Sequence, residues 1–295
     1  MTYRPFSPSR ILTLAGNTFT QLVRMKVFYF LAIFSVLVIG LLFAFVRLDP
    51  EQELNLFKGA SFGTMRLFSI LISISATALL LPKDVEDRTI YTILCKPVPR
   101  YEYLAGKLLG VVALIGVSLL VMDLLASTAL YWRQSQMISD YLGTVPLGEA
   151  MKMEEAGEHL RHLQEQGLTW NLHWAAFIIF LEAFVLTSVT LLLSTVATST
   201  LFTILVGICV FFIGQGQALM REYFLNTPGA GWMTHALTFV GSLIFPDLQM
   251  FGITEEILRG QLVPLMVILK LTGFSAMYTG LYFFAAYFLF AEKEL

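Results

Sequence analysis

The chain contains several apolar stretches that are as long as a lipid bilayer is thick. Residues 27–46 form one of them, and they include no Asp, Glu, Lys or Arg. A helix needs about 20 mostly apolar residues to cross the hydrocarbon core of a membrane. The stretches are continuous rather than alternating, which favours helices over the strands of a β-barrel. We therefore expect an all-α integral membrane protein.

Composition supports the same fold class. Hydrophobic residues make up 57% of the 295 residues and charged residues only 14%, whereas an ordinary soluble domain is about a quarter charged. A water-soluble fold would have too few ionic side chains to cover its surface. The net charge of −2 also disfavours a nucleic-acid partner, which requires a basic face.

Six spans are expected within a single transmembrane domain that covers residues 1–295. They are predicted at residues 27–46, 61–81, 108–132, 172–197, 201–220 and 261–290. Arg66, inside the second span, is expected to snorkel toward the interface. No small-residue cleavage site follows the first span, so we interpret it as a retained helix and not a signal peptide. The outer loops are predicted at residues 133–171 and 221–260, and a cytoplasmic connection at residues 82–107.

Basic residues indicate the orientation. They precede the first span as Arg4, Arg10, Arg24 and Lys26, and they crowd the connection as Lys83, Arg88, Lys96, Arg100 and Lys107. Cytoplasmic loops carry an excess of Lys and Arg. This bias predicts a multi-pass protein of the cytoplasmic (inner) membrane with both termini in the cytoplasm.

Two further segments are neither spans nor ordinary loops. Residues 10–26 place Ile11, Leu12, Ala15, Phe19, Leu22 and Val23 on one helical face, which predicts an amphipathic helix lying in the interface. The segment 232–251 is apolar but is broken by Gly241 and Pro246. It is too polar and too interrupted to span, so we predict a re-entrant-like outer segment, a shape that requires cover from other helices.

The connection 82–107 carries a predicted short helix over residues 84–96. Acidic residues lie in its first turn and Lys96 lies in its last, as the helix dipole favours, and Pro97 and Pro99 follow. Such a helix, apolar on one side and charged on the other, suits either a groove on a partner protein or the membrane surface. Both interpretations are open from the residues alone.

This connection resembles the first cytoplasmic loop of type-2 ATP-binding-cassette (ABC) permeases, the exporter-type membrane subunits. The matching residues are Glu86, Thr89, Leu94, Pro97, Arg100, Gly106 and Lys107. Arg88 departs from the common pattern, which has glycine there. The order of an amphipathic helix, six spans and a broken outer segment is similar to that family as well.

The resemblance implies a non-enzymatic transporter subunit that pairs with a second permease copy or a homologous permease in the lipid membrane. A separate cytosolic ATPase would hold ATP and Mg, since Gly106-Lys107 lacks the remainder of a P-loop. We expect no catalytic residue, cofactor or metal in this chain. The implied ATPase-coupling residues are Glu86, Asp87, Arg88, Thr89, Ile90, Leu94, Pro97, Arg100 and Lys107.

Besides Arg66, three charged residues lie within predicted spans: Asp123, Glu182 and Lys270. Charges in hydrocarbon are costly and normally face protein or water. They suit a substrate or proton path, or a structural pairing of Lys270 with one of the acids. A secondary transporter driven by an ion gradient, and a non-transporting scaffold, are therefore alternatives to the permease.

Two spacings have alternative explanations. His159 and His162 are three residues apart beside acids, which suits either a metal site or a solvated helix face. Gly106 and Gly110 form a GxxxG spacing that is compatible with close helix packing, including packing against a second copy.

Overall fold

A computed structural model describes residues 7–45, 50–86, 99–144, 157, 161, 167–197, 199–226, 233, 241 and 245–292. These residues form helices, and no strand occurs among them. The expected all-α class is thereby confirmed. The helices of the first half are α1 (Pro8–Val23), α2 (Lys26–Phe45), α3 (Pro50–Glu86) and α5 (Arg100–Thr144). Those of the second half are α7 (Leu172–Val196), α8 (Thr200–Asn226), the 3-10 helix η1 (Leu248–Ile253), α10 (Thr254–Leu258) and α11 (Leu265–Glu292).

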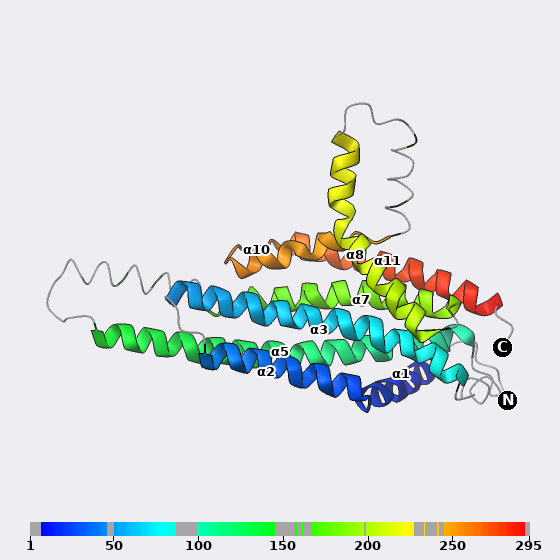
Figure 1. Ribbon diagram of the computed structural model, residues 1–295, viewed down its shortest axis with the longest axis horizontal. Coiled ribbons are helices and arrows are strands. Elements are labelled where there is room, and N and C mark those ends of the chain that lie inside the picture. The colour runs from blue at the N-terminus through cyan, green and yellow to red at the C-terminus, as the bar shows by residue number, and fades with distance from the viewer. Residues whose placement is uncertain are drawn as a thin grey trace.

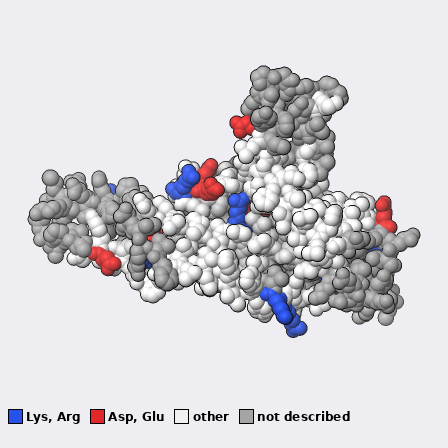
Figure 2. Space-filling model, in the orientation of Figure 1, with Lys and Arg blue, Asp and Glu red and all other residues white. Residues whose placement is uncertain are grey.

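The long helices form an elongated bundle. α2, α3, α5, α7 and α11 run along its long axis, and α1 and the carboxyl end of α11 lie at the same end of the bundle (Figure 1). The carboxyl-terminal part of α8, drawn in yellow, stands away from the other helices (Figure 1). Few charged side chains are visible among the described residues on the face that Figure 2 shows, and many large apolar side chains of the described helices are exposed. The long parallel helices and the scarcity of surface charge are typical of a multi-pass membrane protein.

Five described helices are long and apolar enough to cross a bilayer. They are Gln52–Leu80, Arg100–Gly143, Leu172–Val196, Thr200–Leu219 and Leu265–Glu292. α1 and α2, which meet at a bend of 67°, together make a sixth candidate. Arg24 and Lys26 are both exposed at this bend, as expected for cations where a chain enters the hydrocarbon region.

Three helices are longer than the spans predicted for them: α3, α5, and α8, which continues to Asn226 beyond the predicted end at residue 220. α3 continues beyond the predicted span 61–81 at both ends. α5 covers residues 100–144 and so continues beyond both ends of the predicted span 108–132. Polar residues do not end a helix unless they include a breaker, and residues 133–142 contain no Gly or Pro. The predicted outer loop 133–171 therefore begins as helix, and the predicted connection 82–107 is helical at both of its ends. At 1.5 Å per residue, α5 is about 68 Å long, over twice the hydrocarbon thickness.

α7 is the central helix. It contacts α3, α5, α8 and α11, and most of its side chains are buried on every face. A helix that is apolar all round is suited to that position. Its predicted bounds, 172–197, agree with the observed helix within one residue.

α1 lies against the first turns of α5. Its buried residues are Ala15, Thr18 and Leu22, whereas Leu12 is 68% exposed, so the buried face is rotated from the predicted one. A Cβ on Gly106 would lie 2.5 Å from Leu14 Cβ, and the two glycines therefore allow the helix backbones to approach closely. The GxxxG spacing is used within the chain, by α1, and is not an open face for a second copy. The interfacial position of α1 stays a prediction.

Candidate functional site

The predicted coupling residues fall into two groups. Asp87, Arg88, Thr89, Ile90, Leu94 and Pro97 lie outside the described residues. Glu86 is the last residue of α3, and Arg100 and Lys107 belong to the first two turns of α5. The described structure therefore places the two helices that the connection joins, and shows what holds the amino-terminal end of α5.

Arg100 joins the start of α5 to the end of α11. Its Nη1 donates hydrogen bonds to the carbonyl oxygens of Phe290 and Ala291, at 2.8 and 2.6 Å, and its guanidinium lies 5.8 Å from the ring centroid of Phe290. The last carbonyls of a helix have no partners within the helix. Arg100 supplies donors to two of them, and its positive charge is favourable at that helix end.

Glu102, which the sequence analysis did not single out, joins α5 to α1. Its carboxylate is buried and accepts hydrogen bonds from Arg10 Nε at 2.7 Å and Arg10 Nη2 at 2.9 Å. The backbone N–H of Ser7 also donates to it, at 2.8 Å. Glu102 is an acid among many basic residues, and this was the feature of the sequence that could have marked it as a partner for one of them. Its partner, however, is 92 residues away in the sequence.

Lys107 is buried, with its ammonium 5.6 Å from the ring centroid of Tyr103. That contact is a cation–π interaction within α5. Lys107 is therefore part of the packing at the base of the bundle and does not lie on its outer surface.

Glu182 is the centre of a polar cluster inside the bundle. Both of its carboxylate oxygens accept hydrogen bonds from Arg66 at 2.8 Å, and Gln215 Nε2 donates to Oε1 at 2.7 Å. The three side chains come from α7, α3 and α8, and Glu182 is only 1% exposed. The prediction that Arg66 snorkels to the interface was wrong, because a buried carboxylate offers the guanidinium a partner across the helices.

Asp123 forms the second buried pair. Its Oδ2 lies 2.6 Å from His173 Nδ1, and its Oδ1 has no hydrogen-bond partner among the described residues. Lys270 is exposed on α11. The suggested pairing of Lys270 with an acid was therefore wrong, since His173 and Arg66 fill those positions.

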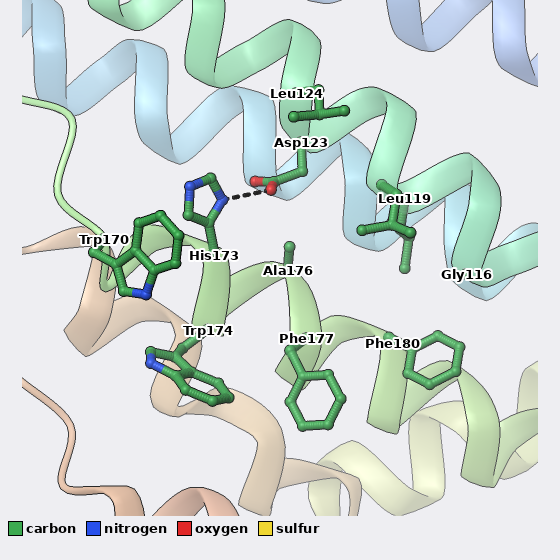
Figure 3. Close-up of a pocket in the computed structure, with 11 residues that line it drawn as sticks. Gly116, Leu119, Asp123, Leu124, Trp170, His173, Trp174, Ala176, Phe177 and Phe180 are labelled. Atoms are coloured by element: carbon green, nitrogen blue, oxygen red, sulfur yellow. Dashed lines mark hydrogen bonds and ion pairs between the residues drawn. The ribbon is translucent and has the colours of Figure 1, made fainter.

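An apolar groove of about 750 Å³ lies beside the Asp123–His173 pair, between α5 and α7. Figure 3 shows Trp170 beside His173 and Trp174 below them, with Phe177 and Phe180 further along α7. The α5 wall includes Leu120 and Leu124 in addition to the pair's own Asp123. Ligand pockets are typically apolar with a few placed polar groups, and have volumes of roughly 300–1,000 Å³. The groove fits that description.

Metal ligands are not grouped in the part of the chain that the structure describes, where no set of three His, Cys, Asp or Glu side chains could hold an ion. His159 and His162 lie outside that part, and the alternatives for their spacing stay open.

Comparison with known proteins adds no family assignment. No family model matches the chain, and no curated protein sequence matches it either.

Proposed function

We propose that this chain is the permease subunit of an ATP-driven ABC transporter, an exporter, coupled to a separate cytosolic ATPase. The resemblance of the connection between α3 and α5 suggests the family. The observation that carries the proposal is the attachment of the first turn of α5 to two other helices, through Glu102 to α1 and through Arg100 to α11.

This attachment supports a mechanical role for the connection. α3 continues through Glu86 and α5 starts at Arg100, so the connection is bounded directly by helices of 37 and 45 residues. A force applied to the connection would act on α5 and, through its bonded partners, on α1 and α11. Helices transmit such a displacement because packed interiors are close to incompressible.

The test begins with purification of the chain from its native membrane after mild cross-linking, followed by identification of the cytosolic proteins captured. The proposal expects an ATPase among them. In nanodiscs, the permease is expected to stimulate ATP hydrolysis by that subunit, and a variant with residues 86–94 scrambled is expected to insert normally but to lose the stimulation. Glu86→Ala and Thr89→Ala are expected to weaken it.

Glu222→Gln, an exposed change on α8, is the matched control. Failure to recover any ATPase, or full stimulation by the scrambled variant, would contradict the proposal. Pairing with a second or homologous permease, and the location in the inner membrane, belong to the same proposal. The mass of the cross-linked species tests the pairing, and fractionation of the same membranes tests the location.

The Asp123–His173 pair favours a second candidate, a secondary transporter driven by a proton gradient. The pair places two ionisable side chains in contact inside a candidate span, and ionisable residues within spans often mark ion or proton paths. This candidate predicts that the purified chain alone takes up protons in proteoliposomes and that Asp123→Asn abolishes the uptake. The permease proposal predicts no such uptake.

A further inference from the structure

We propose that the groove between α5 and α7 is a binding site for one membrane phospholipid, with its headgroup at His173 and an acyl chain alongside Phe177 and Phe180. This inference goes beyond the proposed function and holds whether or not an ATPase drives the protein. It rests on the shape of the groove, on the gradient of polarity along it, and on the unsatisfied hydrogen-bonding capacity at one end.

The two ends of the groove differ in chemistry. His173 and Asp123 lie at one end, near the start of α7, where Trp170 is 82% exposed. Phe180 and Gly116 lie at the other end, and Phe180 Cε2 is 3.3 Å from the position that a Cβ on Gly116 would occupy. From His173 to Phe180 the helix rises about 10 Å. The lining of the groove therefore changes from polar to wholly apolar over that distance. A lipid shows the same change from its headgroup to its acyl chains.

The position of the groove suits a molecule of one leaflet. The polar end lies near the first turn of α7, at the opposite end of the bundle from the last turn of α3 and the first turn of α5 (Figure 1). Indole rings such as those of Trp170 and Trp174 are favoured at the level of the headgroups. An apolar ligand that enters from water does not require a polar group at one end of its site. A lipid in that leaflet has its headgroup and its acyl chain in the same order as the polar and apolar ends of the groove.

The polar end can bind a phospholipid headgroup. The contact with Asp123 Oδ2 fixes the orientation of the His173 ring, and with Asp123 as a carboxylate, which only accepts hydrogen bonds, Nδ1 is the donor. Nε2 is then available to the groove, since the side chain of His173 is 33% exposed. It accepts from a headgroup hydroxyl or ammonium when the ring is neutral, and donates to phosphate when the ring is charged. A phospholipid carries both kinds of partner.

The unpaired Asp123 Oδ1 is a second indication that points to a ligand. The side chain of Asp123 is only 7% exposed, and this oxygen has no hydrogen-bond partner within the described residues. Buried polar atoms are nearly always satisfied, and an unsatisfied one calls for an explanation such as an additional bound group. A headgroup donor at this end of the groove supplies one.

The test uses the full-length protein, purified and delipidated in detergent, and a phospholipid with a photoreactive diazirine in its acyl chain. After illumination, peptide mass spectrometry locates the label. We expect labelling to concentrate on residues 116–124 and 173–180 and to be displaced by unlabelled phospholipid. Gly116→Leu and Leu120→Trp fill the groove and are expected to reduce labelling there by about tenfold, as is His173→Ala, which removes one hydrogen bond.

Leu205→Phe, on an exposed position of α8, is the matched control and is expected to change nothing. Label spread evenly over the exposed positions of α2, α8 and α11, unaffected by Leu120→Trp, would overturn the proposal, because it would describe ordinary lipid contact. Equal displacement by a fatty alcohol and by a phospholipid would overturn the assignment of the headgroup to His173.

Discussion

Arg10 and Glu102 are joined by two parallel hydrogen bonds, from Nε to Oε2 at 2.7 Å and from Nη2 to Oε1 at 2.9 Å. Bidentate guanidinium–carboxylate pairs are strong and geometrically specific. This pair fixes the amino-terminal helix to the first turn of α5, which is the helix that follows the proposed coupling connection. α1 is thereby part of the base of the bundle and not a separate surface element.

Removing this pair is expected to loosen α1. Glu102→Gln should lower the free energy of unfolding by about 2 kcal/mol, since a buried charged acceptor is lost while Arg10 keeps its charge. Unfolding in mixed detergent micelles measures the change, and Glu292→Gln, exposed at the end of α11, is the control. The exchanged pair Arg10→Glu with Glu102→Arg should recover part of the loss. No recovery would argue against a direct interaction.

The glycines beneath α1 are expected to tolerate no side chain. In Gly110→Ala the new Cβ would lie 2.6 Å from Thr18 Cβ and 2.8 Å from the carbonyl oxygen of Ala15, so α1 must shift. We expect a cost of about 1–3 kcal/mol, as for other overpacked sites, and faster hydrogen exchange in α1. Gly63→Ala on α3, where a Cβ has open space, should be neutral or slightly stabilising. Equal behaviour of the two variants would contradict the close approach.

Breaking the Arg66–Glu182 pair is expected to be severe. Arg66→Met leaves a carboxylate that is 1% exposed without its counter-charge, which costs about 3–5 kcal/mol in comparable buried pairs. The double variant Arg66→Met with Glu182→Met should be less destabilised than Arg66→Met alone, because no charge is left buried. Lys270→Met, at an exposed position of α11, is the control. A double variant as unstable as the two single changes combined would show that the pair is not the source of the effect.

The pair between Arg133 and Glu53 is expected to hold the far end of the bundle. It joins the start of α3 to the part of α5 beyond the predicted span, and both side chains are largely buried. Arg133→Leu should raise hydrogen exchange in residues 50–58 without affecting α7, because the change lies outside the central core. Asp140→Asn, exposed on the same helix, should leave exchange as it was. Unchanged exchange in Arg133→Leu would indicate that packing alone positions α3.

The long apolar helices were predictable because their signal is local. A bilayer demands about 20 apolar residues in a row, and the helix satisfies its own backbone, so α7 and α8 begin within one residue of their predicted starts. The ends of α3 and α5 were not predictable in this way. Beyond the bilayer the apolar requirement disappears, and only a breaker or tertiary contact, such as that of Arg133 with Glu53, decides how far a helix continues.

The sequence by itself determined the class of this protein: an all-helical chain whose apolar segments suit a membrane. It also placed Asp123, Glu182 and Lys270 inside spans, where a charge normally faces protein or water, and of these Asp123 and Glu182 are buried whereas Lys270 is exposed. Only the tertiary structure decided that the partners of the two acids are His173 and Arg66, which lie 50 and 116 residues away along the chain. The physical reason is that a charge in an apolar medium needs some partner, but which one it meets depends on how helix faces pack against each other.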